Sequence, residues 1–552
     1  MELNFIYFDV NINTSLLIEL NGELVFSCNN WDGLAKLGNF EVNNKQLITP
    51  NLFPVVDPLQ QEFELSLMKS KFKFNQVITS SYLMSKRQGS HDYNSYPDIH
   101  EYLNFDGVVM MDSGAFQVLM YGDIDLGVED TLILQKQVKP EIGVIMDHPI
   151  GYDTTYAEAS KRIDNTIINL RKSIPHFEGS DINWTLPIQG GKYINLLRRY
   201  LEEVTKKDIL EHFSFFALGS VVPVMINQDY STLVKMIATA REYLPTTYPL
   251  HLFGAGHPAM FALATFLGCD TFDSAAYALM AKDNRYMSIG GTYNLHDINE
   301  FGCICPVCVD YTPKELISED KRMKKQKLSE HNLWVSRAEL ENIRESIRGG
   351  NLWDLVLQRS GSVPHLKRAT NLALKYINTG KLGELYSAGI PQSRSSQLRI
   401  KSKYDIFRVE FQRVKEASMS IFERLPPKKM IAIAFLMDIS IFNKIPLHQI
   451  PTDIEETVCL ILPPFGIVPI QLTEMYPIGQ LIHELDYDEF PMEFILYQIQ
   501  HLIKLGLEEL VLILPDHWPK TSINSIENLD IKTTQIYAEK PMTEFLNLVR
   551  KN

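Results

Sequence analysis

Four soft metal ligands lie close together in this chain. Cys303, Cys305 and Cys308 fall within six residues, and His331 follows Cys308 after an interval of 22 residues. Three thiolates and one imidazole form the ligand set of a closed, tetrahedral Zn²⁺ site. Because four protein ligands leave no open coordination position, we expect one structural zinc ion that stabilises the fold and takes no part in the chemistry.

Two aspartates, Asp112 and Asp273, form a second reactive pair, and each follows a short apolar run. Displacement at a sugar anomeric carbon with net retention needs one carboxylate as nucleophile. It also needs a second group that protonates the leaving group and later deprotonates the incoming one. An aspartate at a strand end most often caps the following helix. The pair is therefore a hypothesis that depends on the elements that carry it.

Those elements are eight apolar, β-rich runs of seven residues or fewer, which alternate with helical patterns between Thr49 and about residue 290. The clearest helical pattern places Ile194, Leu197 and Leu201 on one face. This alternation is typical of an α/β fold of the (β/α)₈ TIM-barrel type, with an open doubly wound sheet as the alternative. The runs are Leu52–Val56, Val77–Thr79, Gly107–Met111, Ile142–Met146, Trp184–Ile188, Phe213–Leu218, Leu250–Phe253 and Thr271–Phe272.

Polar residues and glycines follow most of these runs, at the strand ends where a barrel keeps its active site. Six such strand ends in one barrel are harder to explain as helix caps than a single one. They comprise Asp112-Ser113-Gly114, Asp147, Gln189-Gly190-Gly191, Gly219-Ser220, Gly254-Ala255-Gly256 and Asp273.

The same patterns predict five consecutive regions. We expect an N-terminal β extension over residues 1–45, the barrel over 46–300 and an inserted zinc-binding subdomain over 301–335. A helical region over 336–425 follows, and a small C-terminal α/β domain over 426–552 begins at Pro426-Pro427.

Composition narrows the class of protein. The 53 Lys and Arg residues against 67 Asp and Glu residues give a net charge of −14, which argues against nonspecific coating of nucleic acid. We expect no secretory signal and no membrane span, and the clustered cysteines favour a reducing, cytoplasmic location. A basic run between Cys308 and His331, expected to be a loop, is either a solvated face or an RNA contact. It comprises Lys321, Arg322, Lys324, Lys325 and Lys327.

Seven motifs, in order along residues 49 to 355, carry a resemblance to a known family. Together with the zinc ligands, the chain resembles the tRNA-guanine transglycosylases, and among them the archaeal, archaeosine-forming branch. The motifs are Asp112-Ser113-Gly114-Ala115-Phe116-Gln117, Gln189-Gly190-Gly191, Gly219-Ser220-Val221-Val222-Pro223, His251-Leu252-Phe253-Gly254-Ala255-Gly256-His257-Pro258, Phe272-Asp273-Ser274-Ala275-Ala276-Tyr277, Ala281-Lys282-Asp283-Asn284-Arg285-Tyr286-Met287 and Cys303-x-Cys305-x-x-Cys308.

The resemblance implies a pentosyltransferase that exchanges guanine at position 15 in the D-arm of tRNA for 7-cyano-7-deazaguanine. It implies that Asp273 attacks the ribose C1′ and holds the tRNA covalently, while Asp112 acts as general acid and base. The flipped base then needs a stacking ring and a few fixed hydrogen bonds. The implied pocket residues are Ser113, Phe116, Asp147, Gln189, Gly219 and Ser220, and Lys282 and Arg285 are expected RNA contacts.

Some features depart from the family pattern. Ser220 stands where a second glycine is usual, and Ser80 where asparagine is usual. We find no C-terminal RNA-binding domain of the PUA type, so RNA is expected to be held by residues 394–403 or by a separate chain. The family implies a homodimer. The alternatives are a DNA-acting or queuine-type deazaguanine transglycosylase, and a non-catalytic RNA-binding partner subunit.

Overall fold

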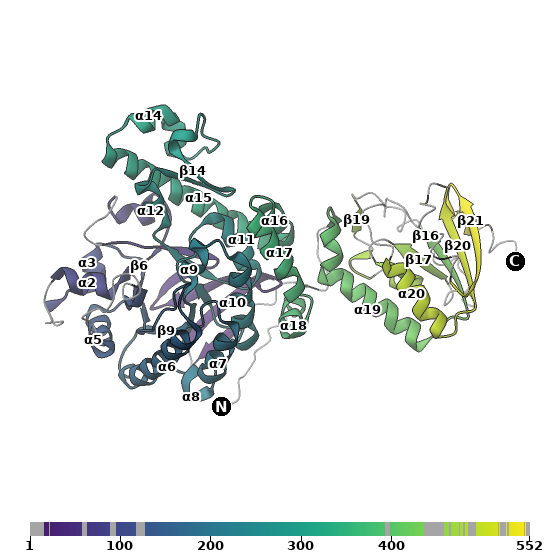
Figure 1. Cartoon of the computed structure of the whole chain (residues 1–552), viewed down its shortest axis with the longest axis horizontal. Coiled ribbons are helices and arrows are strands. Elements are labelled where there is room, and N and C mark those ends of the chain that lie inside the picture. The colour runs from purple at the N-terminus through teal and green to yellow at the C-terminus, as the bar shows by residue number, and fades with distance from the viewer. Residues whose placement is uncertain are drawn as a thin grey trace. The chain divides into compact units, whose positions relative to one another are not determined.

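The computed structural model divides the chain into two compact units, Met1–Gly389 and Ile390–Asn552 (Figure 1). The structure describes residues 16–20, 23–57, 63–88, 95–116, 127–391, 398–434, 458–462, 465–473, 475–478, 481–483, 493–516 and parts of 518–547.

The first unit is built on an eight-stranded parallel sheet that closes into a near-complete barrel. Its order is β5-β12-β11-β10-β9-β8-β7-β6, and a parallel bridge between Val55 and Ile78 joins the two ends. The predicted (β/α)₈ barrel is confirmed, and the open doubly wound sheet is excluded. The strands are β5 (Asn51–Pro54), β6 (Gln76–Ser80), β7 (Val108–Asp112), β8 (Ile142–Val144), β9 (Asn183–Ile188), β10 (Phe215–Leu218), β11 (Leu250–Leu252) and β12 (Thr271–Ser274).

Helices surround the strands and bury apolar side chains against them. In α7 (Ile194–Val204), Leu197 and Leu201 are fully buried, as their spacing predicts. The other helices between the strands are α1 (Ser66–Ser70), α2 (Ser81–Gln88), α3 (Ile99–Leu103), α5 (Val128–Val138), α6 (Tyr156–Ser173), α8 (Lys207–Leu210), α9 (Val221–Ile226), α10 (Tyr230–Tyr243) and α11 (Pro258–Phe266).

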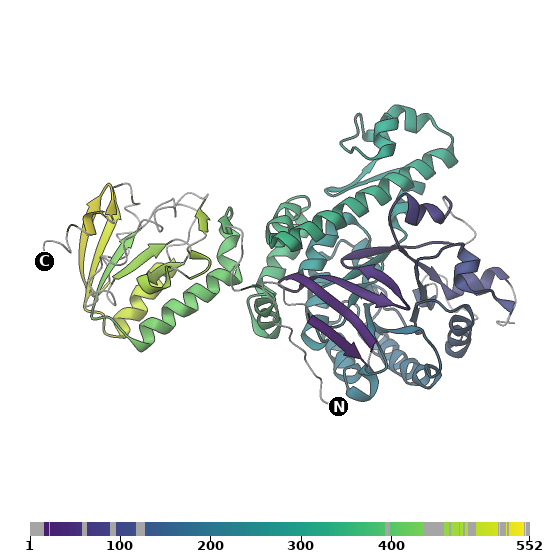
Figure 2. The same cartoon turned by 180° about the vertical axis from the view of Figure 1, so that it is seen from behind.

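A four-stranded antiparallel sheet precedes the barrel and lies in front of it in Figure 2. Its buried Phe26, Phe40 and Leu47 share a core with Val108 and Ile142, which begin β7 and β8. The sheet therefore packs against the amino-terminal end of the barrel and leaves the carboxyl end to the site. Its strands are β1 (Leu16–Leu20), β2 (Glu23–Asp32), β3 (Ala35–Val42) and β4 (Lys45–Ile48).

The cysteine-rich segment follows the barrel and ends in one long helix, α15 (Lys321–Gly349). The basic run between Cys308 and His331 was expected to be a loop. This expectation was wrong, because residues 321–330 form the first part of α15. Asp320 caps this helix, accepting from the N–H groups of Arg322 (2.8 Å) and Met323 (3.1 Å), so the basic run is helical. Preceding α15 are α12 (Ala276–Lys282), β13 (Arg285–Ser288), β14 (Gly291–Asn294), α13 (Pro306–Asp310) and α14 (Pro313–Ser318).

Three more helices complete the first unit: α16 (Leu352–Ser360), α17 (Pro364–Tyr376) and α18 (Gly380–Ala388). Helix α19 (Val409–Arg424), which we placed in a helical region ending at residue 425, lies in the second unit. Its Phe411 and Val414 pack in one core with Val458 and Leu460. The division therefore falls at residue 390, because these apolar side chains bind α19 to the strands that follow it.

The second unit contains a five-stranded sheet of order β18-β17-β16-β20-β21, in which only the edge strand β18 is antiparallel. This matches the expected α/β character. No helix among the described residues is long and apolar enough to span a membrane. The elements are β15 (Leu398–Ile400), which pairs with β19 (Leu481–His483), then β16 (Lys429–Ala434), β17 (Val458–Leu462), β18 (Gly466–Pro469), α20 (Glu493–Lys504), β20 (Glu509–Pro515) and β21 (Lys532–Ala538).

Candidate active site and metal centre

The carboxyl ends of the barrel strands bring three acids together. Asp112 ends β7 and Asp147 follows β8. Asp273 is the next-to-last residue of β12. These strands are parallel members of one barrel sheet, so the three acids lie at the same end of it, and the charges of Asp147 and Asp273 both raise the pKa of Asp112. Residues separated by 161 positions in the chain thus meet at one end of the barrel, as the hypothesis of a carboxylate pair requires.

Asp112 is a weak acid for an aspartate. Burial and the neighbouring charge of Asp147 raise its pKa to about 7, and the N–H of Gly114, which donates to Oδ2 at 3.1 Å, offsets part of that rise. A carboxyl group with a pKa near neutrality can both give and take a proton at that pH. Asp112 therefore has the property that a general acid and base needs.

Asp273 is held through one of its two oxygens. Its Oδ1 accepts hydrogen bonds from His251 Nε2 at 3.0 Å and from the N–H of Gly254 at 2.7 Å. Gly254 has a φ of +68°, and a Cβ there would lie 2.1 Å from a methyl carbon of Val222. Glycine is therefore needed to bring this N–H against the carboxylate.

Asp147, Gln189 and Ser220 form one hydrogen-bonded chain. The N–H of Ile150 donates to Ser220 Oγ at 2.8 Å, Ser220 donates to Gln189 Oε1, and Gln189 Nε2 donates to Asp147 Oδ2. Burial raises the pKa of Asp147 to about 6, although the amide of Gln189 stabilises its charge. The chain sets the amide orientation, since Ile150 can only donate and the Asp147 carboxylate accepts.

The backbone after β10 comes unusually close to this chain. A Cβ on Gly219 would lie 2.1 Å from Gln189 Nε2, so only glycine leaves the amide in place. Ser220 adopts a left-handed φ of +59°. Ser220 therefore stands where a glycine is usual in the family, and its hydroxyl joins the hydrogen-bonded chain.

The remaining expected pocket residues lie on the β7 side of the barrel mouth. Ser113 is fully buried and its Oγ accepts from the N–H of Ala115 at 3.4 Å. Phe116 is half-buried. Gln117, the last residue of that motif, lies outside the described residues.

The two expected RNA contacts differ in solvent exposure and in hydrogen bonding. Lys282 ends α12 and is exposed, whereas Arg285 is half-buried and donates from Nη2 to the carbonyl of Thr292 at 3.1 Å across the β13–β14 hairpin. Of the basic residues expected to hold RNA near residue 400, Arg399 and Lys401 are exposed, and Arg394 lies outside the described residues.

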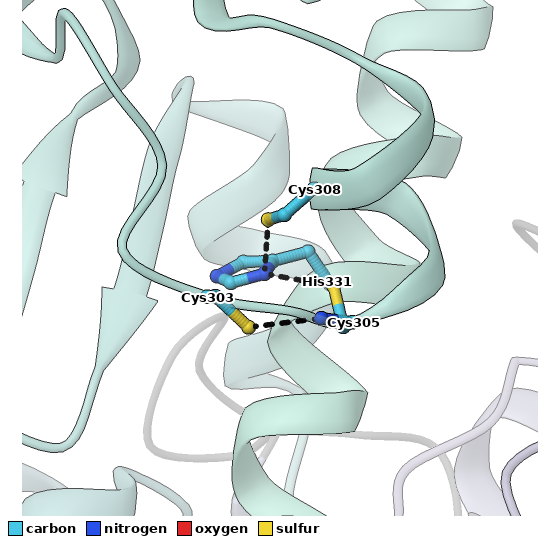
Figure 3. A group of neighbouring side chains, drawn as sticks. All are labelled: Cys303, Cys305, Cys308 and His331. Atoms are coloured by element: carbon cyan, nitrogen blue, oxygen red, sulfur yellow. Dashed lines mark hydrogen bonds between the residues drawn. The ribbon is translucent and has the colours of Figure 1, made fainter.

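The four expected metal ligands form one cluster. The ligand atoms of Cys303, Cys305, Cys308 and His331 all lie within 4.8 Å of one another. Figure 3 shows the cysteines grouped around the imidazole, with His331 Nδ1 3.4 Å from Cys305 Sγ and 3.3 Å from Cys308 Sγ. This set of soft donors fits a metal ion.

A second layer of contacts orients His331. Its Nε2 donates to the carbonyl of Met287 at 3.0 Å, which turns Nδ1 toward the sulfurs. Tyr286 stacks on the imidazole with a centroid separation of 3.8 Å, and Asn332 accepts from the N–H of Met287 at 2.9 Å. The residue patterns assigned no role to these neighbours, because contacts from a hairpin to a distant helix leave no local signal.

His251 is the other residue that the patterns left without a role. It interrupts the apolar run Leu250–Phe253, and an isolated polar residue in a buried strand is the signal that points to it.

Comparisons with known proteins identify the family to which this chain is similar. A family model described as queuine tRNA-ribosyltransferase matches residues 32–365. The chain is 32% identical over 525 residues to a protein of Methanocaldococcus jannaschii named tRNA-guanine(15) transglycosylase, covering 93% of this chain and 75% of the relative. Proteins of the same name from Methanococcus aeolicus and Methanobrevibacter smithii are each 32% identical, over 464 and 473 residues. Those matches cover 83% and 84% of this chain, and 68% and 70% of the relatives.

Proposed function

Because the chain belongs to the tRNA-guanine transglycosylase family of pentosyltransferases, we propose that it exchanges a guanine of tRNA for a deazaguanine base in archaeosine biosynthesis. Its relatives are named for guanine 15, so the expected target is that position in the D-arm, and the expected incoming base is 7-cyano-7-deazaguanine. The observation that carries the proposal is the meeting of Asp112, Asp147 and Asp273 at one barrel mouth.

The exchange needs two displacements at one carbon. Asp273 attacks the ribose C1′, the bond from C1′ to the guanine nitrogen breaks, and Asp112 gives its proton to the departing base. The incoming base then returns a proton to Asp112, attacks C1′ and releases the Asp273 carboxylate. A pKa of Asp112 near 7 supports both proton transfers.

Recognition of the base is assigned to the hydrogen-bonded chain. Asp147 accepts from purine N–H groups, and the second hydrogen of Gln189 Nε2 donates to a purine carbonyl. The backbone at Gly219 and Ser220, with Ser113, borders the pocket, and Phe116 supplies an aromatic face for stacking. Lys282 and Arg285 are the proposed contacts to the polynucleotide.

We propose that the metal centre holds one Zn²⁺ ion, bound by Cys303, Cys305, Cys308 and His331. Three thiolates and one imidazole suit zinc, and four protein ligands correspond to a structural role. When bound, the ion holds the segment around α13 to helix α15. It supplies no chemistry at the barrel mouth.

The proposed assembly is a homodimer in the cytoplasm that takes tRNA and 7-cyano-7-deazaguanine or guanine as substrates. A separate RNA-binding chain is the alternative means of holding tRNA. The presence of both Asp112 and Asp273 favours an enzyme over a non-catalytic partner subunit, since such a subunit needs neither carboxylate.

Uptake of labelled guanine tests the proposal. We expect the unaltered protein to label tRNA and Asp273→Ala to lose labelling by a factor of at least about 1,000 while zinc content and melting stay unchanged. Glu211→Ala, a change at an exposed acid that follows α8, is the matched control. Undiminished labelling by Asp273→Ala would refute the assignment of the nucleophile.

Parallel reactions with tRNA and duplex DNA identify the polymer. Sequencing of the labelled tRNA then separates guanine 15 from an anticodon position. Label in DNA would favour the DNA-acting alternative, and label in the anticodon would favour the queuine-type enzyme.

A further inference from the structure

His251 lies at the centre of a short hydrogen-bonded relay. It occupies the middle of β11, where its side chain is fully buried. Its backbone pairs in register with Thr271 on β12, and Asp273 lies two residues further along the same strand. Because residues two apart in a strand face the same side, the three side chains converge inside the barrel.

The direction of each hydrogen bond follows from the groups involved. His251 Nε2 lies 3.0 Å from Asp273 Oδ1, and a carboxylate can only accept, so Nε2 carries a hydrogen. In the neutral ring Nδ1 is then an acceptor, and Thr271 Oγ1 lies 2.9 Å from it as the donor. The carboxylate therefore determines the tautomer that presents an N–H to Asp273, and the threonine hydroxyl supplies the hydrogen bond that holds Nδ1.

This arrangement makes the two oxygens of Asp273 unequal. Oδ1 accepts from both His251 and the N–H of Gly254, the latter at 2.7 Å. Oδ2 accepts no hydrogen bond from any residue within the described ranges. One oxygen is therefore fixed, and the other is left available to react.

We propose that His251 is the positioning residue of the nucleophile, with its ring held in place by a hydrogen bond to Thr271, so that Asp273 presents Oδ2 to the ribose carbon. This inference rests on the proposed function, since it assigns a purpose to the relay only if Asp273 attacks a sugar. It adds two residues to the site that do not touch the substrate.

Packing alone does not require a histidine here. The ring is surrounded by the rings of Phe53, Phe215 and Phe253, with centroid separations of 5.8, 6.1 and 4.9 Å. A phenylalanine ring suits such surroundings without burying an unpaired donor. The polar ring is therefore explained by its two hydrogen bonds.

Thr271→Val tests the relay with almost no change in side-chain shape. We expect kcat for guanine exchange to fall about tenfold, because the imidazole loses the hydrogen bond that holds its Nδ1, while the KM for tRNA stays within about twofold. Thr271→Ser keeps a hydroxyl and should restore kcat to within about threefold of the original. Thr185→Val is the matched control, since Thr185 is also buried in a barrel strand and its hydroxyl has no partner among the described residues.

His251→Phe removes the donor itself. We expect a fall in kcat of about 100-fold and an equal fall in the rate at which a covalent complex of enzyme and tRNA forms, as seen on a denaturing gel. Cooperative melting and zinc content of each variant show whether it folds. Thr271→Val remains the decisive variant if His251→Phe does not fold.

The outcomes separate this inference from the proposed function. If the unaltered protein labels tRNA but Thr271→Val behaves like Thr185→Val, the positioning role is overturned. The same conclusion follows if Thr271→Ser fails to recover activity, or if only KM changes. If the unaltered protein labels no tRNA, the proposed function itself fails.

Discussion

At the scale of single residues, the three aspartates of the site differ in their pKa values and in their hydrogen bonds. Asp112 and Asp147 have pKa values raised to about 7 and about 6. Asp273 instead has two hydrogen-bond donors on one oxygen. The environment thus gives Asp112 and Asp147 raised pKa values and gives Asp273 two fixed hydrogen bonds, so one side-chain type is suited to different roles.

The raised pKa of Asp112 predicts a pH-dependent stability. The folded protein holds this proton between the ordinary pKa of 3.8 and about 7, whereas the unfolded chain releases it near 3.8. The folded state therefore binds more protons in this range, and its stability falls as pH rises through it. Asp112→Asn removes the penalty, so we expect it to be more stable than the original at pH 8, by roughly 4 kcal/mol, and nearly equal at pH 4.

Urea unfolding at pH 4, 6 and 8 measures this difference. The exposed acid Asp283, changed to asparagine, serves as the control and should show no such trend. Parallel curves for Asp112→Asn and the original protein across this range would contradict the expected burial of the charge.

At the scale of elements, helix α15 connects the metal centre to the barrel. His331 and Asn332 lie on this helix, and both bond to the β13–β14 hairpin at Met287. The helix also contacts α11 and α12, which flank the strand that carries Asp273. A metal ion bound to His331 therefore stabilises a helix that supports the site without entering it.

Removal of the metal should destabilise this region. We expect chelation to lower the melting temperature of the first unit by roughly 5 °C or more, because ligand binding energy contributes directly to folding. His331→Ala should melt at the same lowered temperature whether or not chelator is present. Cys269→Ala, at a buried thiol outside the cluster, is the control and should keep its response to chelator. Unchanged melting after complete metal loss would argue against a structural ion.

At the scale of the whole molecule, each unit has hydrophobic clusters of its own. Among the described residues, one cluster lies around the barrel and one around the cysteine segment in the first unit, and two clusters lie in the second unit. Since packed cores are the main source of cooperativity, each unit is expected to unfold as its own transition.

A matched pair of substitutions tests this independence. Leu460→Ala in the second unit and Leu197→Ala in the first each remove a fully buried leucine, at an expected cost of about 2–5 kcal/mol. Calorimetry should show that each variant lowers a different transition. At a temperature between the two transitions, the second unit of Leu460→Ala is unfolded and its first unit is still folded. The variant should still label tRNA there if the barrel alone performs the exchange. A single transition lowered equally by both variants would show that the units unfold together.

The sequence by itself determined the parts that depend on local pattern. Alternating apolar runs predicted the eight strands, ligand spacing predicted the cluster of Cys303, Cys305, Cys308 and His331, and the motifs predicted the family. Each of these signals is a pattern of residue types and spacings along the chain, where it is directly visible.

Only the tertiary structure decided how these parts act on each other. Neighbouring strands β11 and β12 place His251 between Thr271 and Asp273, and no pattern in either strand states that pairing. The division at residue 390 likewise depends on the packing of α19 against strands that lie far along the chain. The physical reason is that tautomers, raised pKa values and shared cores arise from contacts between residues far apart in the chain.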